Sequence, residues 1–321
     1  MRRGQNPAKF VDRVARPARI TVAVLTYAPF LSGFFAEALD VIRTCLNSIW
    51  DTTPSPYDLL VFDNGSCREV VDYLAGARAE GKIQYLLLSE ENLGKGGAWN
   101  MILKAAPGEI VAYTDCDARF YPGWLERSLE ILETYPRVGM VTARPFRTPE
   151  GFMTSTVAWA EGDPEVTVER GAFIPWDVFR EFDMSLGQEE GAIRARYERT
   201  EDVRLTYRGV QAHVGASHYQ FVGYKEVLES FVPFEMDRPM GQVRRLDERM
   251  NDAGFLRLMT PEPLMMNMSN SVEPVTAQGD SRPEPRRSRR RRIADWAPVR
   301  RILLKVYDSI FRLYFDRGAS P

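Results

Sequence analysis

The feature that most constrains the fold is a regular alternation of short apolar runs and longer helical patterns between residues 19 and 142. The first run, RITVAVL at residues 19–25, is rich in β-branched residues and ends at a polar turn, which is typical of a buried strand. Four similar runs follow, separated by stretches of helix length. Strands that alternate with helices predict an α/β fold with a mostly parallel sheet covered on both faces.

Composition limits the class of protein further. The chain has 321 residues, of which 44% are hydrophobic and 27% charged, as in a globular protein with a sizeable core. Its three cysteines show no metal-site spacing, so we expect neither a disulfide framework nor a zinc site. We find no signal-peptide pattern and no apolar stretch of about 18 residues. A cytoplasmic protein without a spanning helix is therefore expected.

Polar or glycine-rich segments follow four of the predicted strands, and parallel strands bring such segments to one crevice. One of them, TDCDA, holds Asp115 and Asp117 one residue apart where an apolar run ends. Like charges that close repel and are costly to desolvate, so the pair favours a bound cation. The alternative is a polar turn that only caps the next helix.

Five segments, taken together and in this order, resemble family-2 glycosyltransferases. They are TVAVLTYAPF, LLVFDNGS, ENLGKGGAWN, TDCDARFYPGWLE and TEDVRLTYRG, and the resemblance covers roughly residues 18–225. It implies the GT-A fold, in which a Rossmann-like, mostly parallel sheet is flanked by helices, with a small antiparallel extension on the acceptor side. Two departures concern the nucleotide: Ala28 replaces a usual asparagine, and Asn64 replaces a usual second acid.

The resemblance also implies a sugar donor and its binding residues. The donor would be a UDP-, GDP- or dTDP-sugar. The nucleotide-binding residues implied are Thr26, Tyr27, Asp63, Asn64, Asn92, Gly94, Lys95 and Asp115. Asp117 is the expected metal ligand, and His218 the expected metal or phosphate contact. Oxygen ligands favour Mn²⁺ or Mg²⁺, which would neutralise the charge that grows on the leaving diphosphate.

Asp202 is the residue that the resemblance implies as general base. It would take the proton of an acceptor hydroxyl that attacks from the face opposite the diphosphate, which inverts the anomeric centre. Glu201 is expected to bind or orient the acceptor, and both acids are predicted on a helix over residues 197–209. Without the resemblance, Thr200 and these acids would be only the N-cap and first turn of that helix.

The pattern changes after about residue 150. Residues 152–162 and 165–174 are predicted to be antiparallel strands, and residues 175–186 a helix. The predicted parts are an N-terminal extension (1–17), a nucleotide-sugar-binding half (18–145), an acceptor-side half with the base (146–270), a disordered basic linker (271–292) and an amphipathic helix (293–316).

The C-terminal segment differs in charge from the body. Residues 282–321 hold twelve Arg or Lys against four acids, whereas the whole chain has a net charge of −2. Residues 286–316 therefore favour contact with an anionic membrane surface. The alternative is a helix docked on the body or on a partner subunit, as in a homodimer. No nucleic-acid partner is expected, because the acidic body offers no broad basic groove.

These observations predict an inverting, metal-assisted glycosyltransferase at the cytoplasmic face of a membrane. Its acceptor would be a glycan or lipid-linked molecule in cell-surface polysaccharide or glycolipid synthesis, by analogy with relatives. One alternative is a non-catalytic domain of the same fold that binds a glycan or partner at a membrane. A nucleotidyltransferase is the other, but the segment LTYAPFLSGFF lacks the basic, glycine-rich triphosphate loop that it would need.

Overall fold

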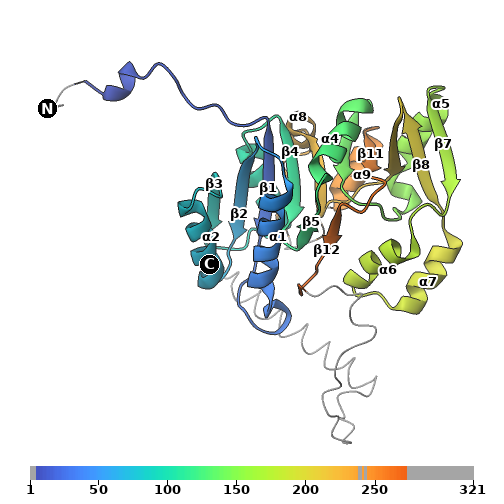
Figure 1. Ribbon diagram of the computed structural model, residues 1–321, viewed down its shortest axis with the longest axis horizontal. Coiled ribbons are helices and arrows are strands. Elements are labelled where there is room, and N and C mark those ends of the chain that lie inside the picture. Colours follow the sequence, from blue (N-terminus) through green and yellow to red (C-terminus); the bar gives the residue numbers. More distant parts are fainter. Residues whose placement is uncertain (1–4, 238–240, 242–243, 273–321) are drawn as a thin grey trace, which may run out of the picture. The chain divides into compact units, whose positions relative to one another are not determined.

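A ten-stranded sheet forms the centre of the computed structural model, which describes residues 5–237, 241 and 244–272 (Figure 1). Across the sheet the strands are β3 (Tyr85–Ser89), β2 (Asp58–Asn64), β1 (Ile20–Thr26), β4 (Ile110–Asp115), β10 (Gln220–Tyr224), β6 (Val138–Thr142), β11 (Leu256–Met259), β9 (Val210–Val214), β8 (Asp202–Tyr207) and β7 (Val166–Gly171). A second, two-stranded sheet pairs β5 (Ala118–Phe120) with β12 (Met265–Asn267).

The direction of the strands matches the predicted α/β fold. Strands β3, β2, β1 and β4 pair in parallel, and β11 is parallel to β6. Strand β10 runs antiparallel between β4 and β6. Strands β9, β8 and β7 add an antiparallel extension at the far edge. The mostly parallel sheet and its antiparallel extension are therefore confirmed.

Helices cover both faces of the sheet because successive strand residues point to opposite sides. In β1, Val22 and Val24 join the core under α1, α2 and α4, whereas Ala23 and Leu25 join the core under α3, α8 and α9. The α-helices are α1 (Ala38–Thr52), α2 (Arg68–Ala79), α3 (Gly94–Ala105), α4 (Trp124–Thr134), α5 (Thr154–Gly162), α6 (Trp176–Ser185), α7 (Glu190–Arg199), α8 (Lys225–Glu229) and α9 (Arg244–Asp252). Short 3-10 turns occupy Pro7–Phe10, Gly33–Phe35 and Glu150–Phe152.

Two predicted elements are wrong. Residues 152–162 contain helix α5 rather than a strand, and its buried Thr156 and Ala160 are four residues apart, which is the spacing of one helix face. The predicted helix over 197–209 is instead the end of α7 followed by strand β8. In β8 the buried apolar residues are Val203, Leu205 and Tyr207, the two-residue period of a strand. The helix predicted over 175–186 is confirmed as α6.

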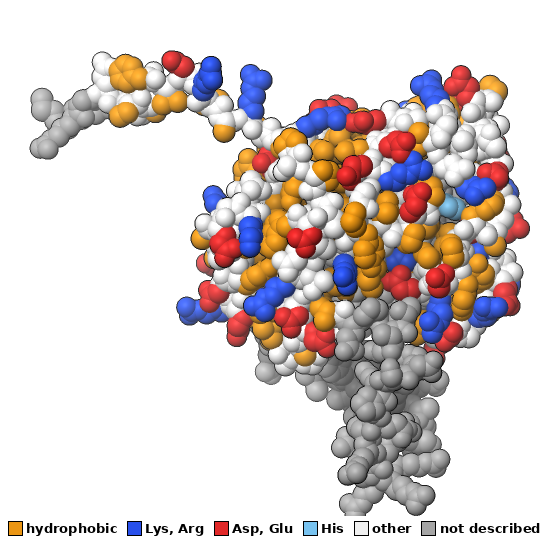
Figure 2. Space-filling view, viewed as in Figure 1, with side chains coloured by type: hydrophobic (Ala, Val, Ile, Leu, Met, Phe, Trp, Pro, Cys, Tyr) orange, Lys and Arg blue, Asp and Glu red, His pale blue; other side chains and the backbone are white. Residues whose placement is uncertain are grey.

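The two ends of the chain differ in what can be described. Residues 5–17 contain only the 3-10 turn, and Phe10 and Val14 are exposed. Figure 2 shows where hydrophobic side chains reach the surface in this view. The predicted amphipathic helix (293–316), and the predicted linker apart from residues 271 and 272, lie outside the described residues. Within the described ranges, no helix has the length and apolar character needed to cross a membrane.

Candidate active site

The carboxyl ends of β1, β2 and β4 lie at one edge of the sheet, as predicted. Thr26 pairs with Asp63, and Leu25 pairs with Asp115, so the last residues of these three strands are level. Helix α3 begins at Gly94 directly after the loop that leaves β3. This edge therefore holds the predicted nucleotide-binding residues.

Asp115 is held by two side chains at this edge. Its Oδ1 accepts a hydrogen bond from the Tyr113 hydroxyl at 2.6 Å, and its Oδ2 lies 2.5 Å from Nζ of Lys95. The Lys95 ammonium also lies 5.9 Å from the centre of the Trp99 ring. Both side chains of the ion pair are largely buried, so Lys95 is a strong local counter-charge for Asp115.

Asp117 lies in the turn between β4 and β5. Burial raises the pKa of its carboxyl to about 7, and the neighbouring Asp115 adds to this rise, while Lys95 opposes it. Asp115 and Asp117 both lose their protons only when a further positive charge lies close to the two carboxylates. Its oxygen-only donor set suits a hard divalent cation. Among the described residues, however, no three His, Cys, Asp or Glu side chains are grouped closely enough to hold a metal ion.

Asp63 lies near the end of β2 and ties it to the end of β1 and to the turn after β2. Its Oδ2 accepts from the Thr26 hydroxyl at 2.9 Å, and its Oδ1 accepts from the Ser66 amide at 2.9 Å. The Asp63 side chain is fully buried by these contacts. Tyr27 follows Thr26, and its ring packs edge-on against the Phe35 ring, with 6.1 Å between the ring centroids. Asp63 therefore shapes the loop on which a nucleotide base would lie.

Asn64 has a similar role in the next loop. Its Nδ2 donates to Oδ1 of Asn92 at 2.9 Å, and its Oδ1 accepts from the Leu93 amide at 2.9 Å. Asn92 Oδ1 also accepts from the Gly94 amide at 2.8 Å. Gly94 has a φ of 68°, a left-handed conformation that favours glycine. The Asn64 amide thus fixes the entry to α3, which places Lys95 beside Asp115.

Asp202, the predicted base, is buried in a different environment. Its Oδ1 accepts from Arg147 Nε at 2.6 Å, and its Oδ2 accepts from the amides of Phe173 and Ile174 at 2.7 and 2.9 Å. It begins strand β8 and does not lie on a helix; Glu201 beside it is exposed. These contacts occupy both carboxylate oxygens, as in a structural ion pair.

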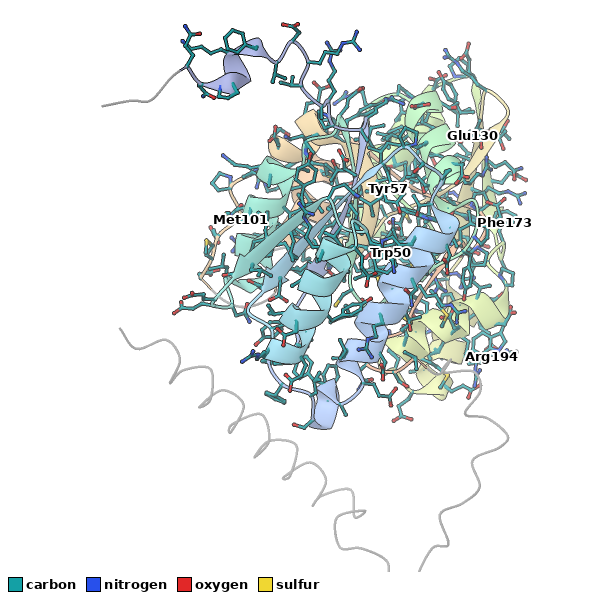
Figure 3. All side chains as sticks on the ribbon, turned by 60° about the vertical axis from the view of Figure 1, so that its left-hand side comes forward. Trp50, Tyr57, Met101, Glu130, Phe173 and Arg194 are labelled. Atoms are coloured by element: carbon teal, nitrogen blue, oxygen red, sulfur yellow. The ribbon has the colours of Figure 1, made fainter. Side chains whose placement is uncertain are left out.

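The sheet order also separates Asp202 from the Asp115–Asp117 edge. Strands β10, β6, β11 and β9 lie between β4 and β8. Figure 3 shows Phe173, whose amide binds Asp202, on the opposite side of the view from Met101 of α3. The joint action of Asp202 and Asp117 on one bond stays a prediction.

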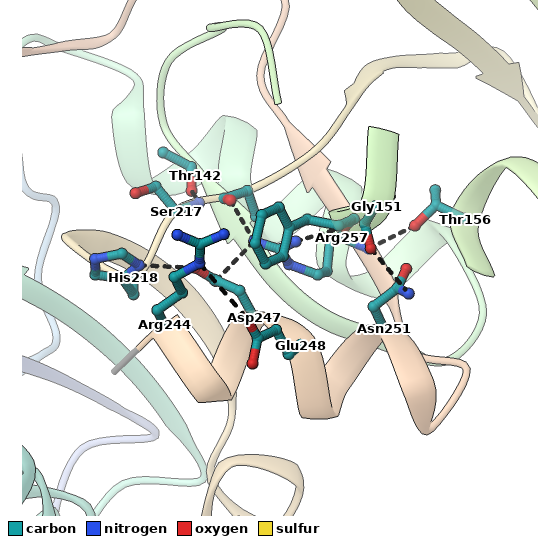
Figure 4. A network of polar contacts seen from close by, with 12 residues as sticks. Thr142, Gly151, Thr156, Ser217, His218, Arg244, Asp247, Glu248, Asn251 and Arg257 are labelled. Carbon is teal, nitrogen blue, oxygen red and sulfur yellow. Dashed lines mark hydrogen bonds and ion pairs between the residues drawn. The ribbon is translucent and has the colours of Figure 1, made fainter. Parts of the chain in front are cut away.

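His218 does lie next to the Asp115 edge. The Asp115 amide donates to the carbonyl of Tyr219 at 2.9 Å, which brings the segment before β10 against the end of β4. His218 Nδ1 is 2.7 Å from Oδ2 of Asp247 on α9 (Figure 4). The grouping of His218 with Asp117 as metal ligands stays a prediction.

Asp247 and Arg257 form a buried ion pair near His218 that the sequence did not predict. Arg257 Nη2 donates to Oδ1 of Asp247 at 2.7 Å, and Arg257 is 1% exposed within β11. An arginine inside the apolar run FLRLM is a signal for a buried ion pair, because a strand cannot bury a guanidinium without a partner. That signal identifies the arginine but not its partner.

Aromatic side chains line the other side of this edge. The ring of Phe182 on α6 stacks on Tyr219 with a centroid distance of 5.5 Å. The Arg144 guanidinium lies 4.9 Å from the Phe182 ring and pairs with Glu181 at 2.9 Å. Helix α6 therefore reaches the neighbourhood of Asp115 from the antiparallel side of the sheet.

Comparison with known proteins supports one family. Residues 34–171 match the family model described as Glycosyl transferase family 2. An uncharacterized glycosyltransferase of Nostoc sp. is 30% identical over 100 residues, which are 31% of this chain and 31% of that protein. The aligned part therefore spans less than a third of this relative.

Two solved structures are similar at low sequence identity. The mannosyltransferase PcManGT from Pyrobaculum calidifontis, in complex with GDP-Man and Mn²⁺, is 19% identical with a TM-score of 0.46, over 78% of this chain and 56% of that chain. S. aureus TarS is 14% identical with a TM-score of 0.42, over 76% of this chain and 57% of that chain.

Proposed function

Because residues 34–171 match the family model described as Glycosyl transferase family 2, we propose that this chain transfers a sugar from a nucleotide diphosphate sugar to an acceptor hydroxyl. The observation that carries the proposal is the cluster of Lys95, Asp115 and Asp117 at the carboxyl edge of the parallel strands. Such an edge is where open α/β sheets bind their ligands. The donor nucleotide is UDP, GDP or dTDP.

The charges at this edge suit a diphosphate. Asp117 and Asp115 would hold Mn²⁺ or Mg²⁺, which when bound neutralises the charge that develops on the leaving diphosphate. The Lys95 ammonium, which pairs with Asp115 in this structure, would release that carboxylate and bind a phosphate oxygen of the donor instead. Asp63 and Asn64 hold the two flanking loops in place, so the donor meets a preformed surface.

Transfer proceeds by a single displacement with inversion. The acceptor oxygen forms its bond to the anomeric carbon as the bond to the diphosphate breaks. A protein group must take the acceptor proton during this step. The acceptor is a glycan or lipid-linked molecule, and residues 286–316, which lie outside the described residues, would hold the enzyme to an anionic cytoplasmic leaflet.

Truncation at about residue 280 should release the protein from anionic liposomes while donor hydrolysis continues; unchanged liposome binding would refute this anchor.

A thermal-shift panel tests the donor site. UDP-glucose, GDP-mannose and dTDP-glucose are added with and without Mn²⁺ to wild type, Asp117→Asn and a control, Asp72→Asn, whose carboxylate is 67% exposed on α2. We expect one donor to stabilise wild type and the control when Mn²⁺ is present, and to leave Asp117→Asn unchanged. Equal donor stabilisation of Asp117→Asn would contradict the metal assignment. Donor binding without turnover would indicate a binding domain instead.

A further inference from the structure

The chain leaves β12 through a short segment that begins at the proposed donor edge. We call residues 268–272 the strap. Its first amide, that of Met268, donates to the carbonyl of Asp117 at 2.7 Å. The next residue, Ser269, has a φ of 56°, a left-handed conformation that residues with a side chain rarely adopt, and its amide donates to Oδ1 of Asn267 at 3.0 Å. The strap therefore starts in contact with the turn that holds Asp117 and changes direction at Ser269.

The other end of the strap is held mainly by one carboxylate. Oε2 of Glu37 accepts from the Ser271 hydroxyl at 2.8 Å and from the Val272 amide at 3.4 Å. The Asn270 side chain donates to the carbonyl of Phe34 at 3.3 Å. All three bonds join the strap to the segment that connects β1 with α1. Because Glu37 is the acceptor of two of them, this one side chain decides whether the end of the strap is held.

The segment between β1 and α1 is the loop on which a nucleotide base would lie. It begins with Tyr27, whose ring packs edge-on against the Phe35 ring. The Phe35 ring also packs against the Phe34 ring, with 5.2 Å between their centroids. The strap binds Phe34 and Glu37, which lie on either side of Phe35 in the chain. Holding these two residues therefore holds the ring against which Tyr27 packs.

Resting on the proposed function, we propose that Glu37 is a positioning residue for the donor. By holding the strap, it fixes the loop at Tyr27 relative to the turn at Asp117. The base of the donor would bind at the loop and its diphosphate at the turn, so one donor molecule has to reach both. Two loops that are already fixed relative to each other cost less ordering free energy when the donor binds. Glu37 acts through the strap and touches no reacting atom, so the step after donor binding is independent of it.

Titration calorimetry of the donor tests this role in the full-length protein. The nucleotide sugar that gives the largest thermal shift with Mn²⁺ is titrated into wild type, Glu37→Ala and Glu37→Gln. We expect the donor Kd of Glu37→Ala to rise by at least the factor of about 2–10 that one hydrogen bond contributes. Glutamine keeps a side-chain oxygen that can accept from Ser271, so Glu37→Gln should bind the donor nearly as wild type does. In donor hydrolysis Glu37→Ala should show a higher KM and an unchanged kcat.

A control and a second variant make the test specific. Asp40→Ala removes an exposed acid of α1 that pairs with Arg43 rather than with the strap, and it should leave the donor Kd unchanged. Ser271→Ala should weaken donor binding in the same direction as Glu37→Ala. The double variant Glu37→Ala with Ser271→Ala should bind the donor no more weakly than Glu37→Ala alone, because both changes remove the same bond.

Several results would overturn the inference and leave the proposed function standing. They are wild-type donor affinity in Glu37→Ala, an equal loss in Asp40→Ala, and losses that add fully in the double variant. A lower kcat with an unchanged KM in Glu37→Ala would also overturn it, because Glu37 would then act after donor binding. A wild type that binds no nucleotide sugar would overturn the inference together with the proposed function.

Discussion

Replacing Asp202 with alanine should unfold the protein more easily rather than remove a catalytic group. The Asp202 and Arg147 side chains are 1% and 5% exposed, and their ion pair measures 2.6 Å. Alanine would leave the Arg147 charge buried without its counter-ion, and the amides of Phe173 and Ile174 without their acceptor. Breaking a buried pair on one side costs about 3–5 kcal/mol.

Differential scanning calorimetry measures this cost. For domains of roughly this size about 1 kcal/mol shifts the midpoint by about 2–4 °C, so Asp202→Ala should melt about 6–20 °C below wild type. The control is Glu161→Ala, which removes the exposed pair with Arg170, where the carboxylate is 57% exposed. Exposed pairs contribute less than about 1 kcal/mol, so the control should melt within a few degrees of wild type.

One result would refute the reasoning on Asp202. If Asp202→Ala has the same melting midpoint as the Glu161→Ala control but hydrolyses no donor, the ion pair between Arg147 and Asp202 is not needed for stability. The carboxylate would then act on the substrate, as the resemblance of TEDVRLTYRG implied, and the sheet would have to rearrange to bring β8 to the donor. A lower midpoint with full turnover in the folded fraction supports the structural role.

Three further predictions concern the donor edge. Because the pKa of Asp117 is about 7, its carboxyl is mostly protonated below pH 7 and mostly ionised above it. Mn²⁺-dependent donor binding, measured by titration calorimetry, should therefore weaken as the pH falls from 8 to 6. A donor Kd that does not change with pH would contradict the metal assignment. Lys95→Met should weaken donor binding by about 10–150-fold, because a bond to a charged group is worth about 1.5–3 kcal/mol, whereas unchanged affinity would leave Lys95 as a partner of Asp115 alone. Asn64→Ala should lower the calorimetric midpoint through the lost Leu93 contact, at a cost of about 1–3 kcal/mol, and an unchanged midpoint would show that the loop holds without it.

The parallel half of the sheet could be predicted because its signals are local. Strands β1, β2 and β4 are short, largely apolar runs that end at polar residues, and their length and flanking turn residues favour buried parallel strands. Topology alone predicts that the segments with Asp63, Lys95 and Asp115 meet at one edge, since the ends of parallel strands meet, whereas the resemblance named the individual residues. The roles of Asp63 and Asn64 did not follow, because their hydrogen-bond partners lie in neighbouring loops.

The antiparallel half was harder because its local signals conflict. Thr200, Glu201 and Asp202 have the chemistry of a helix N-terminus, yet Val203, Leu205 and Tyr207 have the period of a strand. Residues 202–207 form a strand because they pair with β7 and β9. A prediction from a short stretch of sequence does not include those partner strands. The order of motifs along the chain therefore does not fix the strand on which a motif such as TEDVRLTYRG lies.

The antiparallel strand β10 explains why His218 and not Asp202 lies near Asp115. Strand β10 enters the sheet between β4 and β6, so its first residues meet the last residues of β4 although about a hundred residues separate them in the chain. The segment that carries Asp202 is complete before β10 begins and is added beyond β9 at the edge. The start of β10 therefore lies beside Asp115, as the hydrogen bond from the Asp115 amide to the Tyr219 carbonyl shows.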